Sequence, residues 1–168
     1  MRFGIMEMQL NRLVPTDMKG SSAVDQILNF DRAKLVGGLN RAGFSLIELG
    51  GDLGLFFRNA YDQENIERLL RLKAEQNLTF TIHLPLWSVE PSTPLEPVRL
   101  GSVDAIMDVI DAVEPLDPEV YVLHATGALA AEFYRMKISS FAKDLVLKQF
   151  QGGAISSIRV RASSVLSR

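Results

Sequence analysis

Short apolar runs, polar loops and amphipathic stretches follow one another along the chain in a repeated order. The apolar runs at residues 2–6, 45–49, 79–82 and 120–123 have the length and composition of buried strands. The starts of these runs are 43, 34 and 41 residues apart, a spacing that suits parallel strands joined by right-handed crossovers. The pattern therefore predicts an α/β fold of about four βα units.

Helical periodicity fills the intervals between these strands. A first helix is expected over 31–42, with Gly43 as its C-terminal cap. A second begins after Asp62, a good N-cap residue, and a third covers about 98–113 and stops before Pro115. The second helix also carries two acid-first i,i+4 pairs on a face expected to be exposed, namely Glu64 with Arg68 and Glu67 with Arg71.

Glycine and proline mark the connections. Residues 50–54 read Gly-Gly-Asp-Leu-Gly, which predicts a tight turn because it departs from the G-x-G-x-x-G dinucleotide pattern. Residues 84–97 are expected to form a long loop, since four of the seven prolines lie there. After a turn at Thr126 and Gly127, the chain again has helical character to about Phe150.

Four parallel βα units can belong to an open doubly wound sheet or to a (β/α)8 barrel. A complete barrel takes about 250 residues, so the 168 residues of this chain supply only part of one. We expect residues 1–150 to form the N-terminal half of a TIM-barrel domain. Residues 151–168 differ in character and are expected to be a truncated or disordered tail, because residues 145–168 carry a charge of +4 and residues 1–144 carry −6.

The composition excludes several classes of protein. The net charge of −2 gives no support for nucleic-acid binding, and the absence of cysteine removes disulfides and thiolate metal sites. The N-terminus lacks a signal-peptide core, and no apolar run approaches the roughly 20 residues that cross a bilayer. A cytoplasmic protein without a membrane anchor is therefore expected.

The chain has two histidines, and each directly follows a predicted strand. His83 follows Thr79–Ile82, and His124 follows Val120–Leu123. Parallel α/β folds build their sites at the C-terminal ends of strands, and imidazole is a frequent ligand of Zn, Mn, Fe or Co. We therefore predict His83 and His124 as ligands of a divalent metal. The alternative is that each imidazole caps its strand and bonds a loop carbonyl.

Two carboxylates and two further side chains complete the candidate site. Glu48 and Glu7 end the second and first strands, where each could act as a general base, and Glu48 also as a metal ligand. The alternative is a carboxylate held by loop amides. Trp87, in the proline-rich loop, could stack on a substrate or plug the core beneath the loop, and Arg99 could meet an anionic substrate or be solvated.

The motifs Thr-Ile-His83-Leu-Pro and Val-Leu-His124-Ala-Thr-Gly, with Glu48 at the end of the second strand, resemble the xylose-isomerase-like barrels, also known as the AP endonuclease family 2 superfamily. Residues 1–150 look most similar to the cobamide-remodelling phosphodiesterases in that superfamily. The resemblance implies that His83 and His124 are metal ligands. It also implies further ligands from strands five to eight, which this sequence lacks.

The resemblance implies a metal-dependent hydrolase that cleaves a phosphodiester in a small, cobamide-like molecule. A sugar-phosphate isomerase or epimerase of the same superfamily is the first alternative. A chain without catalytic activity is the second alternative. A half-barrel has unpaired strand edges, so such a chain would form a homodimer or bind a partner.

Overall fold

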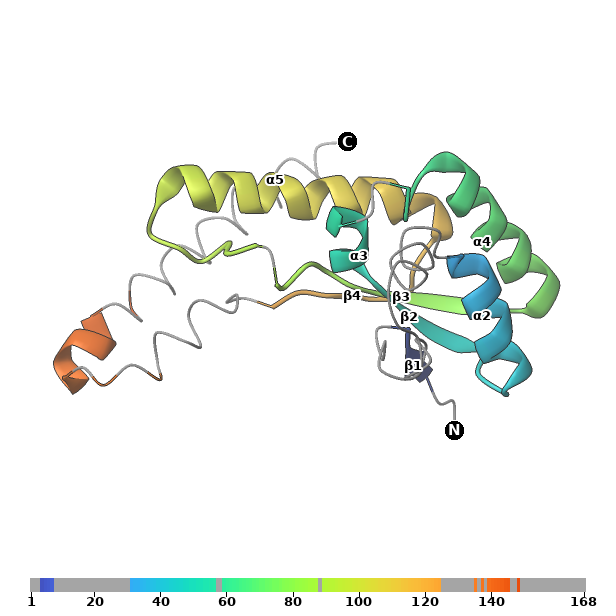
Figure 1. The fold of residues 1–168 in the computed structure, drawn as a ribbon, viewed down its shortest axis with the longest axis horizontal. Coiled ribbons are helices and arrows are strands. Elements are labelled where there is room, and N and C mark those ends of the chain that lie inside the picture. The colour runs from blue at the N-terminus through green and yellow to red at the C-terminus, as the bar shows by residue number, and fades with distance from the viewer. Residues whose placement is uncertain are drawn as a thin grey trace, which may run out of the picture. The chain divides into compact units, whose positions relative to one another are not determined.

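The computed structural model describes residues 4–7, 31–56, 59–87, 89–124, 135, 137, 139–145 and 148. Predicted features at other positions, including the tail 151–168, lie outside the described residues. The helices and strands are β1 (Gly4–Met6), α2 (Arg32–Arg41), β2 (Leu46–Gly50), α3 (Gly51–Phe56), α4 (Gln63–Gln76), β3 (Thr79–His83), α5 (Glu96–Val113), the 3-10 helix η2 (Glu114–Leu116) and β4 (Tyr121–Val122) (Figure 1). Strands and helices alternate as predicted.

The four strands form one parallel sheet in the order β1-β2-β3-β4. Successive side chains of a strand point to opposite faces, and the register aligns Glu48 with Thr81 and Gly50 with His83. One face is fully apolar in β2 and β3, where four side chains are 0% exposed: Ile47, Leu49, Phe80 and Ile82. The opposite face carries half-buried Glu48, Thr81 and His83. The predicted α/β class with parallel strands is confirmed.

The N-cap of α4 and the glycine after α2 agree with the sequence prediction, and Asp31, expected inside the first helix, is the N-cap of α2. The Asp31 carboxylate accepts a hydrogen bond from the Lys34 amide at 2.9 Å, and Asp62 accepts one from Asn65 at the same distance. Gly43, after the end of α2, has φ +101°, a left-handed conformation that side chains with a Cβ rarely adopt. α2 and α4 pack against each other (Figure 1).

The side chains of α4 find partners beyond their own helix. Arg68 Nη2 lies 2.6 and 2.8 Å from the two oxygens of Asp31 in the cap of α2, whereas the sequence predicted Glu64 as its partner. Lys73 Nζ donates to the Leu116 carbonyl at 2.6 Å and so satisfies the C-terminal end of η2. A helix in contact with other elements can use its charges for tertiary bonds, and these replaced the local pairing.

Three elements differ from prediction. Residues 51–56 form α3 rather than a tight turn, and Asp52 in its first turn complements the positive end of the helix dipole. α5 begins at Glu96 and includes Pro97, because the first turn of a helix tolerates proline. β4 was expected to be buried, but Tyr121 is 37% exposed since β4 is the last strand in the sheet order and pairs on one side with β3.

The chain divides into two compact units: Met1–His83 with Val109–Val122, and Leu84–Asp108 with Leu123–Arg168. In the second unit, the connection after β3 is held by buried polar groups. Ser102 accepts from the Glu90 amide at 2.9 Å and donates to the Val98 carbonyl at 2.8 Å, and Ser92 donates to the Glu90 carboxylate at 2.7 Å. The predicted loop is therefore a packed segment, fixed to the start of α5.

Residues 140–145 are helical, in agreement with the helical character expected after residue 127. Among the described residues, no helix is both long enough and apolar enough to cross a membrane.

Candidate functional site

Glu48 and His83 form a hydrogen-bonded pair at the C-terminal ends of two neighbouring strands. His83 Nδ1 lies 2.9 Å from Glu48 Oε1, and the side chains are 17% and 23% exposed, respectively. The parallel register of β2 and β3 brings them together, because Glu48 and His83 have the same strand parity and so share a face. Of the carboxylate and imidazole groups predicted for the site, these two are joined by a direct contact.

The contact with Glu48 fixes the tautomer of the His83 imidazole. A carboxylate only accepts hydrogen bonds, so His83 Nδ1 carries the proton and donates it to Glu48. When the ring is neutral, Nε2 is then its acceptor nitrogen, and the carboxylate orients the ring. Such a pair is suited to general acid–base work.

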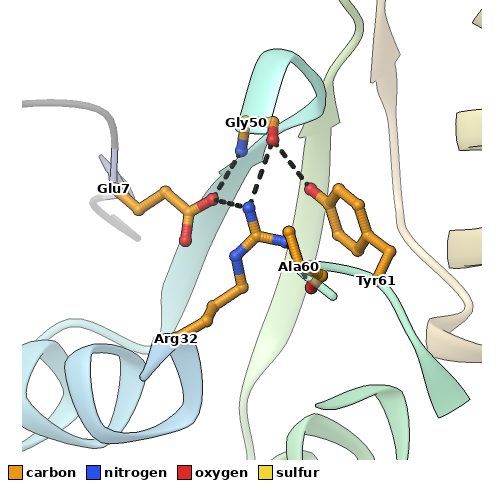
Figure 2. Close-up of polar contacts among 5 residues, drawn as sticks. All are labelled: Glu7, Arg32, Gly50, Ala60 and Tyr61. Atoms are coloured by element: carbon orange, nitrogen blue, oxygen red, sulfur yellow. Dashed lines mark hydrogen bonds and ion pairs between the residues drawn. The ribbon is translucent and has the colours of Figure 1, made fainter. Parts of the chain in front are cut away.

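Glu7 lies in a different environment from Glu48. Its backbone amide bonds the Glu48 carbonyl at 3.0 Å, but its side chain is 0% exposed and forms an ion pair of 2.9 Å with Arg32 Nη2 (Figure 2). Glu7 Oε1 also accepts from the Gly50 amide at 2.7 Å. Glu7 therefore links β1, α2 and the end of β2, an arrangement that supports a structural role rather than the predicted catalytic one.

Arg32, which the sequence did not single out, is the centre of this buried network (Figure 2). It donates to the carbonyls of Ala60 at 3.1 Å and Gly50 at 3.3 Å, and its guanidinium carbon lies 4.0 Å from the centroid of the Tyr61 ring. The Tyr61 hydroxyl donates to the same Gly50 carbonyl at 2.9 Å. The alternation of side chains along β1 could have indicated this environment. Glu7 lies on the same face of the sheet as Ile5, and that is the face that the helices cover.

Burial controls the ionisation of these groups. Removal from water raises the pKa of the Glu7 carboxyl, although Arg32 and the Gly50 amide oppose the shift. Burial also raises the pKa of the Tyr61 phenol, which therefore stays protonated as a hydrogen-bond donor. The network is thus a buried support behind the strand ends.

The other predicted site residues belong to the second unit. His124 is half-buried and lies two residues beyond β4. Trp87 is 60% exposed, so the alternative of a buried plug does not hold. Arg99 has a side chain that is 16% exposed and pairs with Glu96, one helical turn earlier, at 3.8 Å. Their roles as metal ligand and substrate contacts remain predictions.

The resemblance implies a divalent metal, which needs a group of ligands close together. Three protein ligands are the usual minimum for a catalytic metal. Among the described residues, no group of three or more His, Cys, Asp or Glu side chains is gathered in a way that could hold a metal ion. In this part of the chain, Glu48 Oε1 contacts His83 Nδ1, and the donor set does not fit a complete metal centre.

Comparison with solved structures gives a match over most of the chain. The chain is similar to the crystal structure of a D-tagatose 3-epimerase-like protein, with a TM-score of 0.61 and 18% sequence identity over 95% of this chain and 46% of that one. The chain thus has part of a TIM-barrel fold. It spans less than half the length of that barrel. No protein-family model matches the sequence, and no curated protein matches it.

A TIM barrel places its chemistry at the C-terminal ends of its strands. Glu48 is two residues before the end of β2, and His83 is the last residue of β3. The partial barrel therefore carries a hydrogen-bonded acid–base pair at the end of the strands where such folds act.

Proposed function

We propose that this chain provides the first four strands of a sugar isomerase or epimerase barrel, in which Glu48 and His83 transfer a proton. The observation that carries the proposal is the 2.9 Å contact between His83 Nδ1 and Glu48 Oε1 on adjacent strand ends. The fold likeness to a D-tagatose 3-epimerase-like protein supports the choice of reaction class.

Inversion at a carbon next to a carbonyl requires one proton to leave and one to return on the opposite face. The basic Nε2 of His83 would accept the proton from that carbon, leaving an enediolate. Glu48 would hold the ring through Nδ1 and stabilise the imidazolium that forms. Return of a proton from solvent to the other face of the enediolate gives the epimer. Return of the proton from His83 to the neighbouring carbon, with transfer of the hydroxyl proton between the two oxygens, gives the isomer.

The phosphodiesterase function and the cobamide-like substrate stay as predictions from the sequence resemblance. Hydrolysis of that kind relies on a metal to activate water. An imidazole oriented by a carboxylate is suited to proton transfer, which is why we favour an isomerase or epimerase reaction.

Exchange of substrate hydrogen with solvent tests the proposal. The chain is incubated with D-tagatose in D2O, and deuterium at C3 is followed by NMR. We expect exchange with the wild type and its loss in His83→Asn and in Glu48→Gln. Glu67→Gln, which removes an exposed carboxylate bonded to Gln63 on α4, should leave exchange intact.

A second readout does not depend on turnover. With two histidines in the chain, 15N NMR of histidine-labelled protein resolves each ring, and His124→Asn assigns them. We expect His83 to be protonated at Nδ1 in the wild type and to lose this preference in Glu48→Gln. An Nε2-protonated His83 in the wild type, or exchange that survives both substitutions, would contradict the proposal.

A further inference from the structure

A groove with a strong positive charge lies between α2 and α4, apart from the Glu48–His83 pair. Its volume is about 330 Å3. Four cationic side chains and one acid line it, namely Lys34, Arg41, Arg68, Arg71 and Glu75. The excess of positive charge stands out because the whole chain carries −2.

Three of the four cations are available to a ligand. In the part of the chain that the structure describes, Lys34, Arg41 and Arg71 form no ion pair. Arg68 is bonded to Asp31 through Nη2, which fixes its guanidinium at the groove. The positive charge open to a ligand is therefore that of Lys34, Arg41 and Arg71. Cations without acidic partners on both walls of one groove favour an anion as the occupant.

Gly37 keeps the wall formed by α2 low. Gly37 and Gly38 stand side by side inside the helix, where glycine weakens helical structure. A Cβ at Gly37 would lie 3.5 Å from Arg41 Nη1 and 3.9 Å from Leu72 Cδ2, so a larger side chain would occupy the groove. The helix thus gives up stability at the place where the groove needs space.

We propose that this groove binds a small phosphorylated ligand with two or more negative charges. The volume is at the lower end of the range for small-molecule sites, about 300–1,000 Å3. Arginine guanidinium groups match phosphate oxygens with paired, charge-assisted hydrogen bonds. Arg41 on α2 and Arg71 on α4 are placed to hold the ligand from both walls, with Lys34 as a further point charge.

Calorimetric titration with inorganic pyrophosphate at low salt tests the site. We expect saturable binding to the wild-type chain and about tenfold weaker binding in Arg41→Gln and in Arg71→Gln, as expected for loss of one charge-assisted bond. Lys137→Gln is the matched control, because it removes one exposed cation outside the groove. This control should bind like the wild type.

Three results would overturn the proposal. The first is an absence of saturable binding. The second is equal weakening in Lys137→Gln, which would mean that net charge alone attracts the ligand. The third is tighter binding of a short oligoglutamate peptide than of pyrophosphate, which would make the groove a site for an acidic protein segment. All these variants change surface side chains, and circular dichroism verifies that each is folded.

Discussion

Arg32 Nη2 lies 2.9 Å from Glu7 Oε1, with the two side chains at most 1% exposed. The pair joins the first strand to the first turn of α2, and both partners also bond the backbone of Gly50. A charge pair withdrawn from water stabilises a fold only while both members are present, because either one alone is an uncompensated buried charge.

Removal of one member of this pair should therefore be costly. We expect Arg32→Met to lower the free energy of unfolding by about 3–5 kcal/mol, measured by urea denaturation. The double variant Glu7→Leu with Arg32→Met should recover much of the loss, since it leaves no unpaired charge. A double variant less stable than Arg32→Met would show that the pair does not act as a unit.

The Asp31–Arg68 pair should give a pH-dependent contribution. Partial burial alone would raise the pKa of the Asp31 carboxyl, but hydrogen bonds from Arg68 and the Lys34 amide outweigh it and hold the pKa below the usual 3.8. A carboxyl with a lowered pKa in the folded state stabilises the fold above the unfolded pKa, and this stabilisation disappears as the pH falls through the folded value.

Asp31→Asn tests this sign, because asparagine is also a good N-cap. The wild type should be more stable than the variant at pH 7 by at most about 1 kcal/mol, given that the pair is one-third exposed. The difference should shrink as the pH drops below 3.8. Urea denaturation at several pH values measures it, and a difference that grows on acidification would refute the assignment.

Gly38 is a position where alanine should stabilise the protein. An added Cβ would approach no atom more closely than Arg41 Nη2, at 3.8 Å, while the helix gains about 0.5–1 kcal/mol from the change. Thermal denaturation should register the increase. Gly43→Ala is the matched opposite, because φ +101° is strained for alanine, and it should destabilise by a similar amount. A change of stability in the same direction at the two positions would contradict this prediction.

Gly54 should respond in the opposite direction to Gly38, although it also lies within a helix. A Cβ at Gly54 would be 2.6 Å from Tyr61 Cδ2, a contact that requires the buried ring to move. Gly54→Ala should therefore lower the free energy of unfolding by about 1–3 kcal/mol in urea denaturation. Because Tyr61 would be displaced from the Gly50 carbonyl, NMR should also report a change at Gly50, whereas Gly38→Ala should leave it unchanged.

The sequence was sufficient for the elements that local chemistry determines. Asp62 was identified as an N-cap and Gly43 as a helix end, since these roles depend on neighbours within a few residues. The parallel sheet followed from the spacing of apolar runs. The turn expected at residues 50–54 was wrong, because residues 51–56 form a six-residue helix that is too short for apolar periodicity to reveal.

Long-range pairing of side chains could not be predicted in the same way. Glu48 and His83 were identified as strand-end residues, but their direct bond depends on the register between β2 and β3. Glu7 was predicted as a general base, like Glu48, although the two side chains lie on opposite faces of the sheet. Arg32 was not identified from the sequence, because its burial depends on a partner 25 positions earlier in the chain.

The alternation of faces along the second strand has a practical meaning for protein engineering. Glu48 takes part in the acid–base pair on one face, and on the other side the Glu7–Arg32 network is anchored to the backbone of Gly50, two positions later. A library that varies positions 48 and 83 can therefore explore new chemistry while the ionic anchor is kept constant. Conversely, the anchor can be replaced by apolar side chains without a change in the residues of the reactive face.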